Sequence, residues 1–536
     1  MQKSSPSADS SDTPTVHWAD HAAEALLAKH PEKEVLVCAS GISPSGVVHI
    51  GNFREVITVD FVVRALKDRG KKVRFIYSWD DYDALRKVPA NLPNSELIEK
   101  NLRRPLAKIP DPFGTETSYA RHFETRFEKE IAQLGIQPHF IYQNEQYRSG
   151  QYAEGISVAL KNQKKIADIL NRSRTENLPS NWSCLSIFCK QCDRDTTEVV
   201  SHDDTSLVKY FCKACKQEFS IDFRKEEGVK LLWRVDWPMR WSKEQVDFEP
   251  GGKDHSSQGG SYDTGCEIVR EIWKREPPFY VQYDFVLAKG VGSKLSSSSG
   301  NLITLTEALE IYEPALVRYL FASRKPNLDF SIAFDLDVMK AYDDFDRCER
   351  FAFGLEKGED KKVNYEKRIY EFSRVDTSTE NQTLPVQFPF RHLCNLLQIQ
   401  EGDLQKTKAF YQKDIRNDED EKRFLSRSKR AWKWITTYAP EEFRFTLQSA
   451  PKHKSQFPLA MKELVQTLRE GKATQSEEML ANRTWEIMKN HGIEGKVFFK
   501  DVYQVLVAKP NGPKLAAFLL AIGPNRAADI LQKAID

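Results

Sequence analysis

The sequence predicts an α/β fold built on a parallel sheet, followed by an all-helical region. Up to about residue 330, short apolar runs typical of strands alternate with helical patterns and with Gly and Pro breaks. Beyond about residue 340 the pattern is helical: Phe457, Met461, Leu464 and Leu468 recur at helix spacing, and a second helix fits residues 497–507. The charged stretch 358–385 lacks periodicity, so we expect a surface insertion or a mobile linker there.

Length and composition describe a large multi-domain protein. A chain of 536 residues is too long for one hydrophobic core and suggests roughly three to four domains. Its net charge is only +2, so any RNA contact must come from local basic patches. No apolar run approaches the length of a membrane span, and the polar start of the chain lacks the apolar core of a secretory signal. We therefore expect a cytoplasmic protein without membrane contact. The oligomeric state stays open, with a monomer as the expectation.

The first α/β unit carries the first chemical motif. Residues 35–40 read as a buried strand, residues 41–52 (GISPSGVVHIGN) as a loop, and the segment after them as a helix. A loop at the carboxyl end of a parallel strand that opens a helix is where such sheets bind nucleotides. His49 and Asn52 stand at this helix start, where each can donate a hydrogen bond to an oxygen that gains charge during phosphoryl or nucleotidyl transfer. A lone histidine there is also a common cap, so a second motif is needed.

A second motif lies much later, in the segment AKGVGSKLSSSSGN. Lys294 stands among small residues on a loop that follows the apolar strand-like run 280–287. Such a loop can fold over a triphosphate and present a mobile ammonium group to it. Taken alone, a Ser-rich loop with one lysine is equally typical of a linker.

Four cysteines form a separate constellation with the spacing C-x2-C-x19-C-x2-C. Two close thiolate pairs can close a tetrahedron, so the spacing predicts a structural zinc site, with a metal-free group of reduced thiols as the alternative. Four sulfur ligands leave no open position for a substrate, so the metal would hold an insertion together. The predicted ligands are Cys189, Cys192, Cys212 and Cys215, and the other cysteines are expected to be ordinary reduced thiols.

The two loop motifs together resemble the signatures of class I aminoacyl-tRNA synthetases. Residues 49–52 (HIGN) are similar to the HIGH signature, and residues 294–298 (KLSSS) to the KMSKS loop. Longer blocks are similar to class I lysyl-tRNA synthetases: residues 40–55 (SGISPSGVVHIGNFRE), 80–89 (DDYDALRKVP), 233–241 (WRVDWPMRW) and 251–265 (GGKDHSSQGGSYDTG). The resemblance is strong over residues 30–330 and weak over the helical region.

The resemblance implies a domain order. We expect an N-terminal extension (1–30), the first half of a Rossmann-type catalytic domain (31–160), an insertion with a zinc ribbon (161–230), the second half of the catalytic domain with the KMSKS-like loop (231–335), and a helical region that binds the tRNA anticodon (336–536). The insertion is placed to touch the acceptor stem of tRNA.

The implied reaction has two steps. Lysine attacks the α-phosphorus of ATP, which arrives with Mg²⁺, and the lysyl group then passes from lysyl-adenylate to tRNA(Lys). By motif position, His49 and Asn52 would hold the phosphates, Lys294 would stabilise the pentavalent phosphorus, and Ser296 and Ser298 would shape the loop. Further ATP contacts are expected from Pro44, Gly251, Gly252 and Asp254, the last of which could equally be a turn residue.

For the amino acid, the resemblance points to Gly41, Ser43, Trp233, His255 and Tyr283. A lysine side chain needs an aromatic wall for its methylenes and a carboxylate or other acceptor for its ammonium group. Asp81 and Asp83 follow directly after a predicted strand and are candidates for that charge partner, or else residues of a solvated loop. The alternative for Trp233 is packing in the core.

Some features leave alternatives open. The class signature has a second lysine where this chain has Ser297, and the lysyl family often has a lysine where this chain has Ser299. The alternatives are another class I synthetase, such as the glutamyl or cysteinyl type, or a synthetase-like RNA-binding protein without aminoacylation activity. A basic run in the helical region is either a solvated helix face or an RNA patch, and it consists of Arg427, Lys429, Arg430 and Lys433.

Overall fold

The computed structural model describes residues 16–90, 92–289, 303–377 and 383–535. The chain divides into two compact units. The first unit spans Met1–Leu309, Pro314–Ile332 and Arg347–Glu380, and the second spans Glu310–Glu313, Ala333–Asp346 and Asn381–Asp536.

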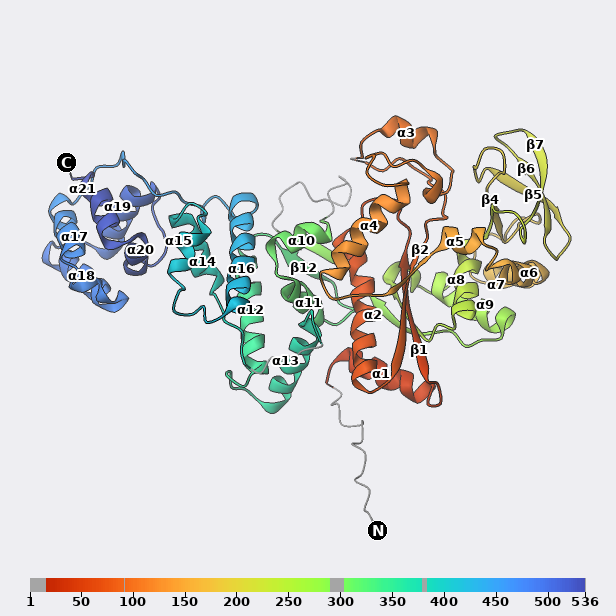
Figure 1. Cartoon of the computed structure of the whole chain (residues 1–536), viewed down its shortest axis with the longest axis horizontal. Helices are drawn as coiled ribbons and strands as arrows, with labels where there is room; N and C mark the ends of the chain where they lie inside the picture. The colour runs from red at the N-terminus through yellow and green to blue at the C-terminus, as the bar shows by residue number, and fades with distance from the viewer. Residues whose placement is uncertain (1–15, 91, 290–302, 378–382, 536) are drawn as a thin grey trace, which may run out of the picture. The chain divides into compact units, whose positions relative to one another are not determined.

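A five-stranded parallel sheet is the centre of the first unit (Figure 1). Its strands are β1 (Val35–Ile42), β2 (Lys72–Trp79), β3 (His139–Tyr142), β9 (Phe248–Gly252) and β10 (Phe279–Tyr283). The spatial order is β10-β9-β1-β2-β3, and every pair of neighbours is parallel. The parallel α/β sheet predicted from the sequence is therefore confirmed. Because the order reverses between β1 and β9, a crevice opens at the carboxyl ends of these two strands.

The first βαβ unit forms as its sequence predicts. The middle of β1 is buried, and α2 (Ile50–Asp68) packs along β1 and β2 (Figure 1). An apolar stripe of Val56, Val59, Val63 and Leu66 is buried on this helix. Gly70 follows the helix at a φ of 74°, a left-handed conformation that favours glycine and ends the helix.

The remaining helical segments of the first unit cover the sheet and support the insertion. They are α1 (Trp18–Lys29), α3 (Ser95–Lys100), η1 (Leu106–Lys108), α4 (Tyr119–Ala132), α5 (Gln143–Arg148), α6 (Ala153–Lys161), α7 (Gln163–Asn171), α8 (Trp233–Glu244), η2 (Lys253–His255), α9 (Ser261–Trp273), α11 (Pro314–Ala322) and α13 (Asp360–Ser373). Two further helices, α10 (Leu305–Ile311) and α12 (Asp337–Ala352), contribute residues to both units.

A small antiparallel insertion lies between the two halves of the sheet. Strands β5 (Thr197–His202), β6 (Leu207–Cys212) and β7 (Gln217–Asp222) form one sheet, and β4 (Leu185–Ile187) pairs with β8 (Val229–Leu231). Buried residues of the insertion, such as Phe188 and Tyr210, share a hydrophobic core with Ile156 and Met239 of the surrounding helices. This shared core fixes the insertion to the unit that contains the parallel sheet.

Two expectations about local structure need correction. The apolar run 280–287 is not one strand: β10 ends at Tyr283, and β11 (Val286–Lys289) pairs with β12 (Phe330–Ala333) in another sheet. The charged stretch 358–385 contains helix α13, whose Ile369 and Phe372 are buried. Its few apolar positions suffice because this helix packs against α11.

The second unit is helical where it is described. Its other helical segments are α14 (Phe390–Ile399), α15 (Leu404–Ala409), α16 (Asp418–Thr437), α17 (Pro458–Glu470), η4 (Ala473–Gln475), α18 (Glu477–Asn490), α19 (Gly495–Val507), α20 (Leu515–Ile522) and α21 (Pro524–Gln532). The predicted positions Met461, Leu464 and Leu468 are buried in its core. The helical character expected from the sequence is therefore confirmed.

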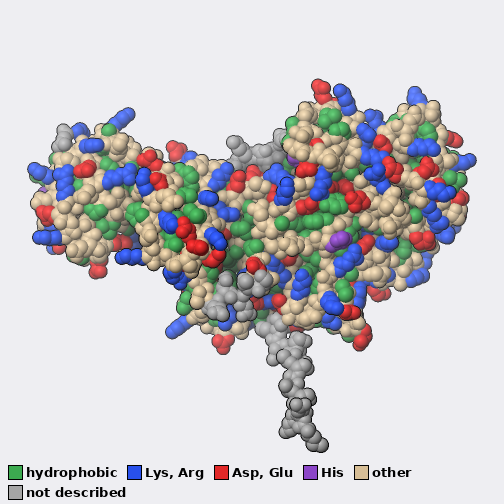
Figure 2. Space-filling view, in the orientation of Figure 1, with side chains coloured by type: hydrophobic (Ala, Val, Ile, Leu, Met, Phe, Trp, Pro, Cys, Tyr) green, Lys and Arg blue, Asp and Glu red, His purple; other side chains and the backbone are tan. Residues whose placement is uncertain are grey.

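The surface agrees with the near-zero net charge. On the face drawn in Figure 2, basic and acidic side chains are interspersed. None of the helices in the described residues combines the length and the apolar character that crossing a membrane requires.

Candidate active site

His49 is placed by the start of α2, at the carboxyl-end edge of the sheet. It is the N-cap of this helix, and its Nδ1 accepts a hydrogen bond from the backbone N–H of Gly51 at 3.0 Å. In return, Oδ1 of Asn52 accepts from the backbone N–H of His49 at 3.1 Å. This reciprocal capping box fixes both side chains at a helix N-terminus, where the helix dipole and free N–H groups favour an anion.

The capping box also determines which hydrogen-bond donors remain. Burial lowers the pKa of His49, so its ring is neutral at neutral pH. Since Nδ1 accepts, the single ring proton is on Nε2. Within the described ranges, neither Nε2 of His49 nor the amide NH₂ of Asn52 has a hydrogen-bond partner. Two donors without partners therefore stand at a site suited to phosphate.

The described flank of the second motif lies beside His49. Ile50 donates its backbone N–H to the carbonyl of Ile303 at 2.8 Å, and Thr304 forms an antiparallel bridge with His49. Lys294, Ser296 and Ser298, together with Ser297 and Ser299, are outside the described residues. The first described residues after that segment, Ile303 and Thr304, thus lie beside the first motif, although more than 200 residues separate them from it in the sequence.

Two glycines allow the backbone to approach closely at the crevice between β1 and β9. A Cβ atom on Gly41 would lie 2.6 Å from the carbonyl oxygen of Ser78 in β2. A Cβ atom on Gly251 would lie 2.1 Å from the hydroxyl of Tyr280, which bonds to Ser256 Oγ at 2.7 Å. Any other residue at either position would displace strand backbone or a fixed tyrosine.

A small cavity of about 30 Å³ lies beside Gly41, between the sheet and α8. Its chemical character comes from aromatic and charged side chains, notably Trp233, Trp237, Asp80, Arg240 and Glu249. Trp233 stacks on Trp237 with ring centroids 5.0 Å apart, and the guanidinium of Arg240 lies 5.4 Å from the Trp233 ring centre. Trp233 keeps 37% of its surface exposed, so it is not a core residue.

Glu55 is a carboxylate at this site that our sequence reasoning missed. Its Oε1 accepts from the backbone N–H of Gly41 at 2.9 Å and from Ser40 Oγ at 3.2 Å, and its Oε2 accepts from the Tyr283 hydroxyl at 2.7 Å. Burial raises the pKa of Glu55, although these three donors act in the opposite direction. Glu55 thereby connects two of the predicted lysine-binding residues, Gly41 and Tyr283.

The two aspartates predicted as charge partners have protein partners of their own. Asp81 is buried, and its carboxylate accepts from the backbone N–H of Asn144 at 2.7 Å. Asp83 forms an ion pair with Lys230. The neighbouring Asp80 is the aspartate that lines the cavity, where it pairs with Arg240 at 2.7 Å. The structure thus brings Asp80 to the cavity, while Asp81 and Asp83 are engaged elsewhere in the same unit.

The other predicted site residues gather around the same crevice. The ring of His255 in η2 lies 6.1 Å from that of Trp233 and 5.7 Å from that of Trp237. Tyr283 ends β10, and Gly252 ends the neighbouring β9. Ser43 and Pro44 follow β1, with Pro44 buried, and Asp254 is exposed in η2.

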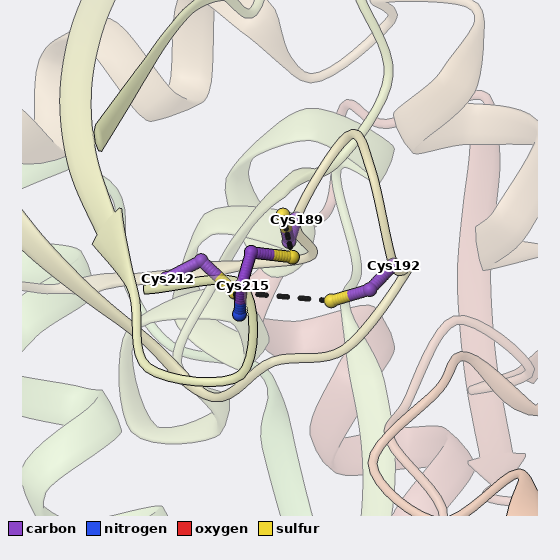
Figure 3. A group of neighbouring side chains, drawn as sticks. All are labelled: Cys189, Cys192, Cys212 and Cys215. Atoms are coloured by element: carbon purple, nitrogen blue, oxygen red, sulfur yellow. Dashed lines mark hydrogen bonds between the residues drawn. The ribbon is translucent and has the colours of Figure 1, made fainter. Parts of the chain in front are cut away.

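The four predicted metal ligands come together in the insertion. Cys189 and Cys192 follow β4, and Cys212 and Cys215 flank the turn between β6 and β7 (Figure 3). All four sulfur atoms lie within 4.8 Å of one another, with Cys189–Cys215 at 3.9 Å and Cys192–Cys212 at 3.7 Å. Zinc–sulfur bonds of about 2.3 Å in a tetrahedron place sulfur atoms about 3.8 Å apart. The residues present therefore fit a four-coordinate zinc ion.

The strand order of the parallel sheet reverses beside the helix that begins at His-Ile-Gly-Asn. This combination is typical of the nucleotide-binding half of a class I aminoacyl-tRNA synthetase. The chain belongs to this class and, within it, to the family described as "tRNA synthetases class I (K)", whose model matches residues 16–376.

Similar proteins extend this match over nearly the whole chain. It is 46% identical to a lysine–tRNA ligase of Borrelia garinii over 97% of this chain and 100% of that protein. It is 45% identical to the lysine–tRNA ligase of Borreliella burgdorferi, over 97% of this chain and 99% of the relative. It is 43% identical to the lysine–tRNA ligase of Treponema pallidum, over 96% of this chain and 97% of the relative.

Most of the missed residues were inside the sequence blocks that carried the resemblance. Glu55 ends the block 40–55, Asp80 begins the block 80–89, and Trp237 and Arg240 stand in the block 233–241. Glu249 lies outside these blocks and is buried between the indole N–H groups of two tryptophans. The available signal for Glu55 was its position three residues after Asn52, which places both side chains on the same face of the helix.

Proposed function

We propose that this protein is a lysine–tRNA ligase, which activates L-lysine with ATP and transfers the lysyl group to tRNA(Lys). The observation that carries the proposal is 46% identity to a relative of that name over 97% of this chain. The unpartnered donors of His49 and Asn52 at a helix start support the nucleotide half of the reaction.

In the first step, a carboxylate oxygen of lysine bonds to the α-phosphorus of ATP as pyrophosphate leaves. Nε2–H of His49 and the amide NH₂ of Asn52 donate to phosphate oxygens as they gain charge. Lys294 neutralises the pentavalent phosphorus, and Ser296 and Ser298 shape the loop that carries it. Magnesium arrives with ATP and supplies charge neutralisation. In the second step, a terminal ribose hydroxyl of tRNA bonds to the lysyl carbonyl carbon, and AMP leaves as the hydroxyl proton is released.

ATP and lysine bind at different parts of the crevice between β1 and β9. Pro44, Gly251, Gly252 and Asp254 contact the adenosine side of ATP. Lysine lies against Gly41 and Ser43, with Trp233, His255 and Tyr283 as its aromatic surroundings. To the predicted charge partners Asp81 and Asp83 we add Glu55, because its carboxylate bonds to Gly41 and Tyr283 at 2.9 and 2.7 Å.

The remaining parts serve the metal and the tRNA. Cys189, Cys192, Cys212 and Cys215 hold a structural zinc ion in the insertion 161–230, which reaches toward the acceptor stem. The helical region 336–536 binds the anticodon. The catalytic domain consists of residues 31–160 and 231–335, and residues 1–30 form an extension that contributes α1.

The test is exchange of labelled pyrophosphate into ATP with each of the twenty amino acids, with and without bulk tRNA. Exchange with lysine alone supports the proposal, whereas exchange with glutamate or cysteine would assign the chain to another class I specificity. Silence under both conditions, with retained tRNA binding, would favour a synthetase-like RNA-binding protein. A His49→Asn variant, which keeps the helix cap, shows whether any exchange depends on this site.

A further inference from the structure

Arg54 of α2 is a buried side chain whose hydrogen bonds, within the described residues, all go to backbone carbonyls. Its Nη1 donates to the carbonyls of Asp284 and Phe285 at 2.8 and 2.9 Å. Its Nη2 donates to three carbonyls of the segment 325–328 at 3.1, 2.8 and 2.6 Å. One guanidinium group therefore joins two separate backbone segments to α2.

The guanidinium of Arg54 is a buried charge without a carboxylate partner among the described residues. Burial lowers the pKa of Arg54 to about 10, so the group is still charged at neutral pH. The carbonyls and the ring of Phe330, whose centre lies 5.1 Å from Cζ, offset the lost hydration. An apolar side chain could fill the same space without desolvating a charge, but it could not hold two backbone segments at fixed distances. We therefore take the role of Arg54 to be positional.

The segments that Arg54 joins lie where the chain leaves the central sheet. β10 ends at Tyr283, and β11 follows after two residues. β11 lies beside α2, pairs with β12 in a two-stranded sheet, and exposes most of its side chains. Neither the central sheet nor a hydrophobic core therefore fixes its position, and a two-stranded sheet alone is marginal. The bonds of Arg54 to the residues just before β11 and β12 fix this pair of strands to α2.

β11 directly precedes the segment of the sequence that carries Lys294. On the far side of that segment, the carbonyl of Ile303 accepts from the backbone N–H of Ile50 at 2.8 Å. That second junction uses backbone atoms of α2 and does not depend on a particular side chain. α2 thus holds both described flanks of the segment, one through its backbone and the other through Arg54.

We propose that Arg54 is a positioning residue for lysine activation, which sets the place of the strand before Lys294 relative to the helix start at His49. The inference rests on the proposed function, in which donors from both motifs act on the same triphosphate. A displacement of about 1 Å in such a site can cost about 10²-fold in rate. Lysine binding depends less on Arg54, because Tyr283 is also held by its pairing with β9 and by its bond to Glu55 at 2.7 Å.

The test substitution is Arg54→Lys, which keeps the charge but cannot reach both backbone segments at once. Lysine-dependent pyrophosphate exchange is measured on the full chain with bulk tRNA present, below the unfolding temperature of each variant. We expect kcat to fall by about 10–100-fold and KM for lysine to stay within about twofold of the wild type. Hydrogen exchange should accelerate in residues 285–289 and not in residues 279–283 of β10.

The matched control is Arg318→Lys. Arg318 is also fully buried, and it donates to the carbonyls of Leu134 and Phe372 at 3.0 and 2.8 Å and to the carboxylate of Asp60 at 2.5 Å. None of these groups belongs to the segments that Arg54 joins. The same substitution at this position should lower stability and leave both kcat and the hydrogen exchange of β11 unchanged.

Phe330→Leu is a milder second variant, to be used if Arg54→Lys does not fold. It removes the ring beside the guanidinium and keeps an apolar side chain, so kcat should fall by about two- to fivefold. The hydrogen exchange of residues 285–289 should again accelerate.

Two results would overturn the inference. An unchanged kcat in whichever of the two variants folds would mean that Arg54 does not position the reaction. An equal loss of kcat in Arg318→Lys would mean that Arg54 only stabilises the fold. If either result came with normal lysine-dependent exchange in the wild type, the proposed function would stand and only the role of Arg54 would fall. Absence of that exchange in the wild type would remove both.

Discussion

At the scale of single residues, His49 has two separable roles. Its Nδ1 caps α2 through Gly51, and its Nε2–H is the donor assigned to the phosphates. Asparagine is among the best N-cap residues, and its side-chain oxygen can replace Nδ1 as the acceptor. It is too short to replace the donor at Nε2. Replacing His49 by asparagine should therefore remove the donor to the phosphates and keep the N-cap of α2.

We expect His49→Asn to lower the rate of lysine-dependent exchange by about 10²–10³-fold, the usual effect of removing one donor to a developing charge. The free energy of unfolding should change by less than about 0.5 kcal/mol, because the cap is retained. Exchange kinetics and urea denaturation measure the two quantities. His49→Ala is the comparison: it should lose the same activity and about 1 kcal/mol of stability as well. Full activity in His49→Asn would remove this residue from the site.

The role of Glu55 predicts a pH dependence with a definite sign. Burial raises the pKa of its carboxyl group, so it takes up a proton at a less acidic pH than an exposed glutamate does. Only the ionised form pairs with a lysine ammonium group. Lysine affinity should therefore weaken as the pH falls through this raised pKa, while affinity for ATP should not follow the same curve.

Glu55→Gln keeps the size and one acceptor oxygen but removes the charge. We expect lysine affinity to fall by about 10–150-fold, which corresponds to about 1.5–3 kcal/mol for a charged hydrogen bond, and the acid dependence to disappear. Calorimetric titration with lysine at several pH values measures both. Asp81→Asn and Asp83→Asn are the controls, and a larger loss in either would move the charge partner to that residue.

The residue-level outcome shows what a sequence can and cannot reveal about a site. His49 and Asn52 were predicted because they stand together in one short signature, HIGN, at the start of a helix. Glu55 was missed because its partners Gly41 and Tyr283 lie 14 and 228 residues away, so only the fold gives it a role. For the same reason the sequence could not separate Asp80, which pairs with Arg240, from its neighbour Asp81.

At the scale of elements, the cysteine cluster is linked to the segment that follows β2. Asp193, next to Cys192, pairs with Arg104 at 2.9 Å and with Lys108 at 2.8 Å. The segment that carries these two cations is itself bonded to the loop after β2: Ala107 N–H donates to the carbonyl of Asp81 at 2.9 Å. We therefore expect that an ordered backbone around Cys192 also keeps the loop that starts with Asp80 ordered.

This linkage predicts an effect of metal removal beyond the insertion. The purified chain should hold about one zinc ion, and Cys212→Ser should lose it, because three ligands no longer close the tetrahedron. Hydrogen exchange of full-length protein should then accelerate in the insertion and also in peptides covering residues 81–85 and 100–108. The linkage would be contradicted if Cys212→Ser kept its zinc, or if hydrogen exchange accelerated only within the insertion.

Asp193→Asn tests the ion pairs of Asp193 with Arg104 and Lys108 separately from metal binding. Asparagine tolerates the left-handed backbone at this position, where φ is 57°, so the knuckle should keep its zinc. The lost charge should lower the local opening free energy of residues 100–108 by about 1–3 kcal/mol. Glu198→Gln is the matched control, since this acid pairs with Lys213 within the insertion. It should leave those peptides unchanged.

Sequence patterns located most elements but misjudged two, for physical reasons. The run 280–287 is mostly apolar, and its one charged residue, Asp284, is too weak a local signal to mark the point where β10 ends and β11 joins another sheet. The signal was Arg54, which donates to the carbonyls of Asp284 and Phe285 between the two strands, and this contact spans 230 residues. Helix α13 buries two apolar residues on a charged background, too few for a periodic pattern to be seen.

At the scale of the whole molecule, the sequence indicated a change from α/β to helical structure but not how the two units share the chain. Short segments of residues 310–346 belong to the second unit, although they lie within the stretch that otherwise completes the first. The basic run on α16 illustrates the consequence. Arg427 was considered as a solvated or RNA-binding residue, yet it is fully buried, with its guanidinium paired to Asp346 at 2.8 Å and to Glu313 at 2.9 Å. Both expectations for Arg427 were wrong, because its partners come from those early segments.

Arg427→Met should therefore act on stability and not on RNA contact. It leaves two buried carboxylates without their cation, which typically costs about 3–5 kcal/mol. Hydrogen exchange in α14 and α16 of the full chain should report a loss of that order in the second unit. Lys429→Met, an exposed position on the same helix, should stay within about 0.5 kcal/mol of the wild type. Below the temperature at which the second unit opens, Arg427→Met should retain lysine-dependent exchange, since every described residue assigned to lysine and ATP is in the first unit. A stable Arg427→Met variant with weakened tRNA binding would instead place this arginine at an RNA surface, and its burial against Asp346 and Glu313 is the reason to expect otherwise.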